Sequence, residues 1–197
     1  MTDGGRYGAR RASIAERRER KAEVDDPAVV LGAAARFLEP RARSVAEVRR
    51  RLTGAGYRVD LVEGAITRML ELGMLDDEAF ARAWVESRDR ARPRGERAIR
   101  QELGLKGVDR PTIDLVLGER REAMAGVPDD DDGSLSPDHV AAAHLVARNA
   151  RSLARIVDPR QRRQRAYALL ARNGFDPEVC RSVAATVDEF GEVPEAD

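Results

Sequence analysis

The sequence predicts an all-α protein: a tandem array of three three-helix repeats that forms an elongated, curved molecule. Three observations lead to this prediction. Signals for the start of a helix recur along the chain, no segment alternates apolar and polar residues as a half-buried strand does, and one apolar pattern ending in glycine occurs three times. A single three-helix unit buries its apolar faces poorly, so we expect stacked copies to form an extended array.

Capping signals mark where the helices begin. A Ser or Asp directly precedes a proline four times, at Asp26, Ser136, Asp158 and Asp176. Such a side chain accepts a hydrogen bond from a free backbone amide, and proline suits the first helical position because the amide there needs no partner. Ser44-Val-Ala-Glu47 has the spacing of a capping box. These signals predict helices that start near 27, 45, 137, 159 and 177.

The repeated pattern places two apolar residues one helical turn apart, then a glycine and a further apolar residue. Its three copies are Val48, Leu52, Gly56 and Tyr57; Ile99, Leu103, Gly107 and Val108; and Ala166, Leu170, Gly174 and Phe175. Glycine ends a helix readily because it enters the left-handed backbone region without steric cost. Each copy therefore predicts the middle helix of a repeat, the alternative being a chance pattern in an Ala- and Leu-rich chain.

Apolar positions continue in register on both sides of each middle helix. The helices that follow carry Val62 and Ile66, Ile113 and Leu117, and Cys180 and Ala184. The helices that precede are expected at 27–39 with Leu31, Ala35 and Leu38, at 77–91 with Phe80 and Trp84, and at 137–155 with Val140 and Leu145. The repeats are thus predicted at 26–74, 75–125 and 137–190.

The remaining segments are polar and poor in large apolar residues. Residues 1–25, rich in Arg and Glu, predict a disordered or loosely helical basic tail. Residues 126–136 combine Pro, Gly and four consecutive Asp residues, which predicts an acidic linker between the second and third repeats. Residues 191–197 predict a second tail.

Charge is balanced in total but segregated along the chain. Lys+Arg and Asp+Glu each number 35, yet residues 148–172 contain eight arginines and a single acid, Asp158. The middle helix of every repeat is the basic one, which indicates a recurring surface for a polyanion or an acidic protein groove. An ordinary solvated helix face is the alternative. The candidate contact residues are Arg49, Arg50, Arg94, Arg97, Arg100, Lys106, Arg162, Arg163 and Arg165.

The sequence contains no catalytic constellation, and we expect no catalytic residue, cofactor or metal. His139 and His144 are five residues apart, which is poor spacing for shared metal ligation, and a lone cysteine, Cys180, cannot complete a zinc set. The same single cysteine excludes an internal disulfide and fits a reducing compartment. No apolar stretch approaches the roughly 18 residues of a membrane helix, and there is no secretory signal. These features predict a cytoplasmic protein that does not enter a membrane.

The residues from Ser44 to Gly107 resemble the RecX family of bacterial regulators of the recombinase RecA. The resemblance rests on Ser44, Glu47-Val48, Leu52 and Gly56, on the run Leu-Gly-Met-Leu-Asp-Asp-Glu-Ala-Phe-Ala at 72–81, and on Gly95, Ile99, Glu102-Leu103 and Lys106-Gly107. The repeat layout extends it over about 27–190. Ala166 departs from the usual Ile or Val, and the acidic insert before the third repeat is long.

The resemblance implies a non-catalytic modulator that binds the RecA–single-stranded-DNA filament and regulates recombination, DNA repair and the SOS response. The implied partners are RecA and, through phosphate contacts, single-stranded DNA, and we expect the protein itself to be a monomer. The alternative is a direct DNA-binding, helix-turn-helix-like transcriptional regulator. Its weakness is that the Arg-rich helices lack the Asn, Gln and Ser positions typical of base recognition.

Overall fold

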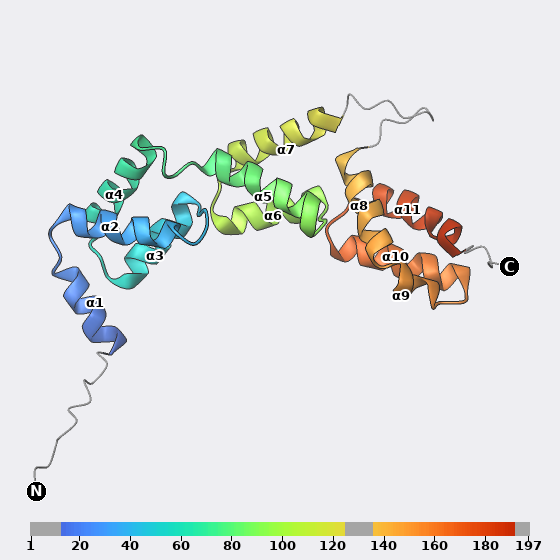
Figure 1. The fold of residues 1–197 in the computed structure, drawn as a ribbon, viewed down its shortest axis with the longest axis horizontal. Helices are drawn as coiled ribbons and strands as arrows, with labels where there is room; N and C mark the ends of the chain where they lie inside the picture. The colour runs from blue at the N-terminus through green and yellow to red at the C-terminus, as the bar shows by residue number, and fades with distance from the viewer. Residues whose placement is uncertain (1–12, 125–135, 192–197) are drawn as a thin grey trace, which may run out of the picture. The chain divides into compact units, whose positions relative to one another are not determined.

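The computed structural model describes residues 13–124 and 136–191 of the 197-residue chain (Figure 1). Within these ranges the regular structure comprises eleven α-helices and one short 3-10 helix, and no strand is present. The predicted all-α helical repeat is therefore confirmed. The chain divides into two compact units, Met1–Asp76 and Asp77–Asp197.

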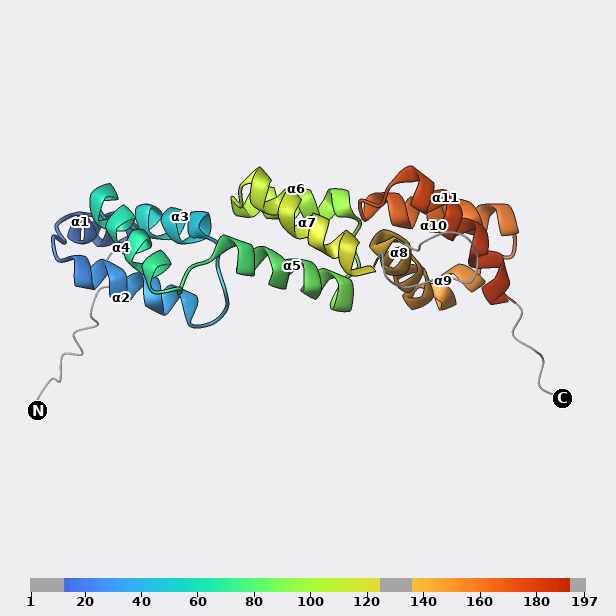
Figure 2. The same ribbon diagram turned by 90° about the horizontal axis from the view of Figure 1, so that it is seen from above.

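The first unit contains helices α1 to α4, which Figure 2 shows from above. Helices α2, α3 and α4 pack together around a core in which Val30, Val48, Leu52, Val62 and Met69 are at most 2% exposed. As predicted, Asp26 caps α2, and Ser44 and Glu47 form the capping box of α3. The helices are α1 (Ile14–Ala22), α2 (Pro27–Leu38), α3 (Val45–Ala55) and α4 (Val59–Glu71).

Helix α1 lies in the segment 1–25 that was expected to be a disordered or loosely helical tail, and it is a regular helix with a defined start. Ser13 and Glu16 form a capping box, with the Ser13 amide 2.6 Å from Glu16 Oε2 and the Glu16 amide 3.2 Å from Ser13 Oγ. No residue of α1 is buried, and its sequence accordingly has no apolar face that would have predicted a packed helix. Its backbone lies close to Gly56, where an added Cβ would be 2.7 Å from the Arg18 carbonyl oxygen. The rest of the predicted tail, 1–12, lies outside the described residues.

The second unit contains helices α5 to α11 and the 3-10 helix η1. It has two apolar cores, one around Ile99, Leu103 and Leu117 and the other around Leu170 and Phe175. The elements are α5 (Asp77–Ala91), α6 (Glu96–Lys106), α7 (Arg110–Met124), α8 (Pro137–Arg148), α9 (Ala150–Ala154), α10 (Pro159–Arg172), α11 (Pro177–Ala185) and η1 (Thr186–Gly191). Most of the acidic linker, 125–135, and the residues 192–197 lie outside the described ranges.

The glycine-terminated pattern is confirmed in all three copies. Gly56, Gly107 and Gly174 have φ values of 103°, 82° and 81°, in the left-handed region that favours glycine. The nine apolar residues of the pattern are all buried, the most exposed being Tyr57 at 8%. The apolar pairs expected on the helices that follow, on α4, α7 and α11, are buried as well.

The helices that precede the middle helices differ more from expectation. The helix expected at 137–155 is interrupted at Asn149, whose side-chain amide donates to the Leu145 carbonyl at 2.8 Å. Val140 was expected to be a core position but is 44% exposed, while the smaller Ala141 and Ala142 are buried. Small side chains let α8 approach α10 and α11 closely, which turns the Ala face inward.

The second and third repeats join through a close backbone contact. The Gly95 amide donates to the Asn173 carbonyl at 3.0 Å, and a Cβ added to Gly95 would lie 2.3 Å from the Gly174 carbonyl oxygen. Only a residue without a side chain fits there. Gly95, before α6, and Gly174, after α10, therefore contact each other where the second and third repeats meet.

Candidate partner-binding surface

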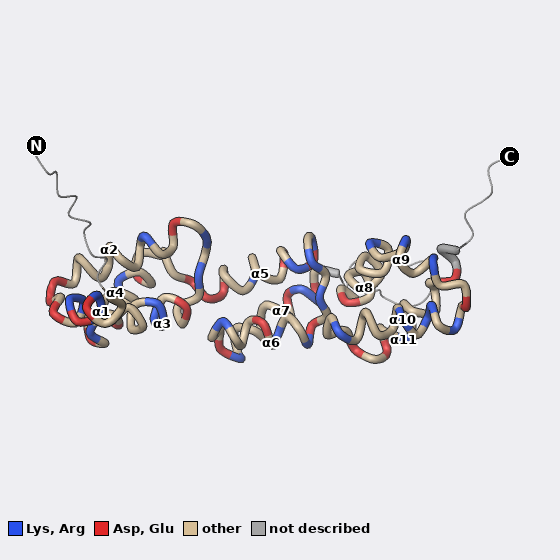
Figure 3. The backbone as a smooth tube through the Cα atoms, turned by 90° about the horizontal axis from the view of Figure 1, so that it is seen from below, with Lys and Arg blue, Asp and Glu red and all other residues tan. Residues whose placement is uncertain are grey.

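The middle helices α3, α6 and α10 carry most of the predicted contact residues, and Figure 3 marks the basic positions in blue. Arginines with an acidic partner inside the protein are partly neutralised, whereas an exposed arginine without one keeps its charge for a partner. This distinction divides the nine candidates. They remain predicted contacts.

In the first repeat, Arg49 forms a bidentate ion pair with Glu63 of α4. Its Nε lies 2.6 Å from Oε1 and its Nη2 lies 2.8 Å from Oε2. The Arg49 guanidinium holds the pKa of the Glu63 carboxyl below its usual range. Arg50, the next candidate, is exposed.

In the second repeat, three of the four candidates have internal contacts. Arg100 is ion-paired with Glu96 and Asp114. Arg94 donates to Asn173 Oδ1 at 2.6 Å and therefore helps to join the second and third repeats. Lys106 Nζ lies 4.9 Å from the centroid of the Trp84 ring. Arg97 is exposed and has no ion-pair or hydrogen-bond partner among the described residues.

In the third repeat, Arg162 is largely internal. Its side chain is 14% exposed and donates to the Ile156 carbonyl at 3.0 and 3.1 Å, which holds the loop between α9 and α10. Arg163 pairs with Asp188 at 3.0 Å. Arg165 is exposed and, within the described part of the chain, has no partner.

Four further exposed arginines in the segment 150–172 were not among the candidates. Arg151 and Arg155 lie one turn apart at α9, and Arg165 and Arg172 lie two turns apart on one face of α10, with Arg160 at its start. None of Arg151, Arg155, Arg160 and Arg172 has an acidic partner in the ranges that the structure describes. The charge run 148–172 was visible in the sequence, but the pairing that neutralises Arg162 and Arg163 was not. We call Arg151, Arg155, Arg160, Arg165 and Arg172 the α9–α10 arginines.

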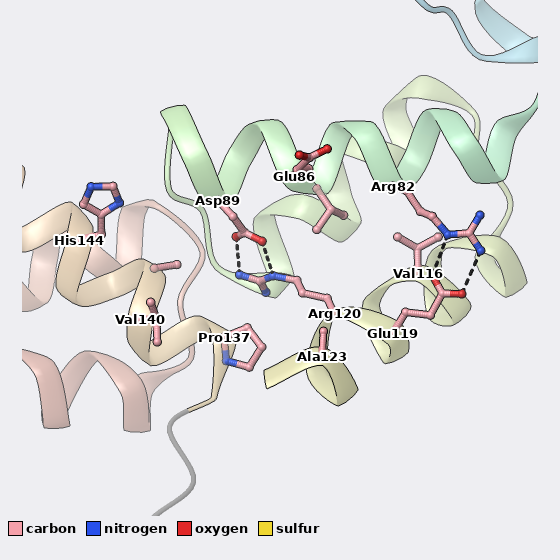
Figure 4. Close-up of a pocket in the computed structure, with 12 residues that line it drawn as sticks. Arg82, Glu86, Asp89, Val116, Glu119, Arg120, Ala123, Pro137, Val140 and His144 are labelled. Carbon is pink, nitrogen blue, oxygen red and sulfur yellow. Dashed lines mark hydrogen bonds and ion pairs between the residues drawn. The ribbon is translucent and has the colours of Figure 1, made fainter. Parts of the chain in front are cut away.

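Arg120 was missed because nothing in the sequence distinguishes it from surface arginines. Its side chain is 6% exposed and is held by two carboxylates. Asp89 of α5 lies at 2.8 and 3.0 Å (Figure 4), and Asp138 of α8 lies at 2.7 Å. Asp138 also accepts from the Glu96 amide at 2.9 Å. This network fixes the junction between the second and third repeats and has a positioning role.

A cavity of about 470 Å³ lies beside this network between α5, α7 and α8 (Figure 4). Its walls are mainly apolar, and Val140, unexpectedly exposed for a predicted core residue, is part of them. Each carboxylate of the lining is engaged by an arginine: Glu86 by Arg90, Asp89 by Arg120, and Glu119 by Arg82. The cavity therefore presents mainly apolar surface to any group that enters it.

The described ranges contain no group of three or more His, Cys, Asp or Glu side chains arranged to hold a metal ion. Cys180 is buried, its Sγ lies 3.6 Å from the Phe175 carbonyl oxygen, and burial raises the pKa of its thiol. A buried thiol of this kind is unsuited to nucleophilic chemistry. In the part of the chain that the structure describes, every helix is too short or too polar to span a bilayer.

Comparison with known proteins identifies the family of the chain. Residues 31–69 match the family model for the first three-helix domain of RecX, and residues 76–117 match the model for the second. A protein of Mycobacterium avium (strain 104) named "Regulatory protein RecX" is 33% identical over 151 residues, which cover 76% of this chain and 80% of that protein. The chain belongs to the RecX family.

Other members of the RecX family are also similar to this chain in sequence or in fold. The RecX protein of Mycolicibacterium smegmatis is 36% identical over 114 residues, which span 49% of this chain and 61% of the relative's length. The crystal structure of RecX from Lactobacillus salivarius has the same fold, with a TM-score of 0.67 at 18% identity, covering 84% of this chain and 98% of that one. The two RecX domain models match the first two predicted repeats of this chain.

Proposed function

We propose that this RecX-family protein is a non-catalytic modulator of RecA that binds the RecA–single-stranded-DNA filament and regulates recombination, DNA repair and the SOS response. Family membership is the observation that carries the proposal. The α9–α10 arginines support it, because exposed guanidinium groups without internal partners suit phosphate or carboxylate ligands. Action on such a filament places the protein in the cytoplasm, and we propose that it acts as a monomer.

The internal contacts of the candidates refine which residues bind. Arg97 and Arg165 are proposed as direct contacts, together with Arg151, Arg155, Arg160 and Arg172. Arg94 and Arg162 are proposed as positioning residues, because their guanidinium groups hold Asn173 and the Ile156 carbonyl. Arg49, Arg50, Arg100, Lys106 and Arg163 stay candidates that must release or share an internal contact in order to bind.

The test adds the purified protein to RecA on single-stranded DNA and follows ATP hydrolysis and filament binding. The native protein is expected to change the hydrolysis rate at a concentration stoichiometric with RecA. The double variant Arg155→Gln/Arg165→Gln should need at least about tenfold more protein for the same effect, since each lost phosphate contact weakens binding. The matched control is Arg58→Gln/Arg68→Gln, which removes two exposed arginines that already have acidic partners.

The control should act like the native protein. An unchanged hydrolysis rate with excess native protein would exclude RecA as the partner. Tight, sequence-selective binding to duplex DNA in the absence of RecA would instead identify a direct DNA-binding regulator. Equal effects of the two double variants would reject the assignment of the α9–α10 arginines.

A further inference from the structure

The first repeat contains a pocket with an unbalanced charge. It has a volume of about 350 Å³ and is formed by α1, α2, α3 and the residue Tyr57 that follows α3. One cation comes from each helix: Lys21 from α1, Arg36 from α2 and Arg51 from α3. The remaining lining residues are Ala33, Phe37, Leu52, Ala55 and Tyr57, so no described carboxylate balances the three charges.

None of the three cations has an acidic partner elsewhere among the described residues. Lys21 Nζ lies 4.9 Å from the centroid of the Tyr57 ring, and Arg51 Cζ lies 5.6 Å from that of Phe37. Arg49, only two residues before Arg51, forms a bidentate pair with Glu63. On that side, therefore, α3 meets a carboxylate of α4, whereas Arg51 has no acidic partner among the described residues. Three like charges around one pocket repel each other, and a bound anion removes that repulsion.

The aromatic residues of the pocket restrict the kind of anion. Phe37 already has two guanidinium groups against its ring, Arg43 with Cζ at 4.3 Å and Arg51 at 5.6 Å, and Tyr57 has Lys21. Tyr57 is also only 8% exposed. Stacking of a nucleic-acid base needs an open ring face, which neither residue offers. The volume is near the lower end of the range for small-molecule sites, so a compact ligand fits best.

We propose that this pocket binds a phosphate group. Arginine forks and a lysine ammonium are the side chains that bind phosphate oxygens, and three cations match the charge of a pyrophosphate better than that of a single carboxylate. The phosphate belongs either to a small free anion or to the backbone of a nucleic acid. The site lies in the first repeat, away from the α9–α10 arginines in the sequence, and it goes beyond the proposed binding to RecA.

Helix α1 completes this site. Lys21 is near its C-terminal end, and the Ser13 capping box fixes where the helix begins. The contact between the Arg18 backbone and Gly56 brings α1 against the end of α3, beside Tyr57. The segment expected to be a tail thus supplies one of the three cations.

Titration calorimetry of the full chain with sodium pyrophosphate at low ionic strength tests the proposal. The native protein is expected to bind it, and Arg36→Gln/Arg51→Gln should lower the affinity at least tenfold. Arg58→Gln/Arg68→Gln removes the same number of charges from the same unit, at exposed arginines that already have acidic partners, and should bind pyrophosphate as the native protein does. If a thymidine oligonucleotide displaces pyrophosphate, the phosphate comes from a nucleic-acid backbone; simultaneous binding of both identifies a small free anion.

Absence of binding heat with native protein at millimolar pyrophosphate would overturn the proposal, as would equal loss of affinity in the two double variants. Tighter binding of a short oligo-glutamate at the same site would show that the ligand is an acidic peptide and that the phosphate proposal is wrong. Should circular dichroism show that Arg36→Gln/Arg51→Gln is unfolded, Lys21→Gln takes its place, because Lys21 is on the helix without buried residues. Pyrophosphate binding is measured without RecA, so its failure is distinct from failure of the proposed function.

Discussion

At the scale of single residues, Arg120 shows how a charge can be structural. Its guanidinium group donates to Asp89 and Asp138, which come from helices of two different repeats, and the side chain is only 6% exposed. Removing one partner of a buried ion pair leaves the other charges without compensation, which costs more than the pair contributes. Asp138 is the more affected partner, because its side chain is 14% exposed against 38% for Asp89.

We therefore expect Arg120→Met to lower the free energy of unfolding of the second unit by about 3 kcal/mol. The control is Arg82→Met, which removes an exposed arginine paired with Glu78 and Glu119 and should cost no more than about 1 kcal/mol. Urea unfolding followed by the fluorescence of Trp84 measures both. Equal losses in the two variants would show that Arg120 does not hold the junction.

At the scale of elements, the helix ends carry much of the architecture. Three glycines with positive φ end the middle helices, while Gly95 starts α6 with an ordinary φ of −70°. Gly95 therefore owes its place to the close approach of Gly174 and to the hydrogen bond with the Asn173 carbonyl. The same residue type serves two different physical needs within one repeat.

Gly95→Ala is expected to destabilise the protein by about 1–3 kcal/mol, because the new methyl group overlaps the Gly174 backbone. Gly118→Ala, inside α7, is the matched control: nothing lies within 4 Å of its added Cβ, so the higher helix propensity of alanine should stabilise by about 0.5–1 kcal/mol. Thermal unfolding of both variants tests the opposite signs. A stabilising Gly95→Ala would contradict the observed junction.

Ion pairs between neighbouring helices predict a loss of stability in acid. Hydrogen bonds from Arg49, Arg100 and Arg82 lower the pKa values of Glu63, Asp114 and Glu119, respectively. A carboxyl whose pKa is lower in the folded state stabilises the fold above its unfolded pKa, about 4, and loses that effect as pH falls through the folded pKa. The melting temperature should therefore fall from pH 5 to pH 3, and less so for Glu63→Gln. Because these pairs are exposed, each contribution is small.

At the scale of the whole molecule, a net charge of zero conceals a local excess of arginine. The zero total predicts no general attraction to polyanions, so salt-sensitive binding must come from particular surfaces. The α9–α10 arginines are our candidates for such a surface, because no acid among the described residues pairs with them. The pocket of Lys21, Arg36 and Arg51 is a second, independent excess.

The proposed binding to the RecA–single-stranded-DNA filament should weaken as salt is added. If Arg155 and Arg165 each contact a phosphate, Arg155→Gln/Arg165→Gln should reduce the slope of log affinity against log salt concentration by about 1.4, from about 0.7 for each contact to a single strand. Fluorescence anisotropy over a salt series measures the slope. An unchanged slope with weaker binding would mean that these arginines contact protein.

Most of the helices, many of their caps and the repeat can be read from the sequence alone. These features depend on local chemistry: Ser44 and Glu47 satisfy neighbouring amides, Gly56 permits the left-handed turn, and apolar residues spaced by one turn share a face. The basic character of the middle helices was equally readable. Which arginines remain available was not, because Arg49 and Glu63 are 14 residues apart and Arg120 and Asp89 are 31 apart.

The remaining features depend on how the helices pack against each other. This packing made α1 part of the first unit through a backbone contact with Gly56, and it brought Lys21, Arg36 and Arg51 to one pocket. In the folded protein Val140 lines a cavity, and the backbone of Gly95 lies against that of Gly174. Each of these outcomes depends on which faces of separate helices meet, and helix periodicity alone leaves that choice open until the cores have packed.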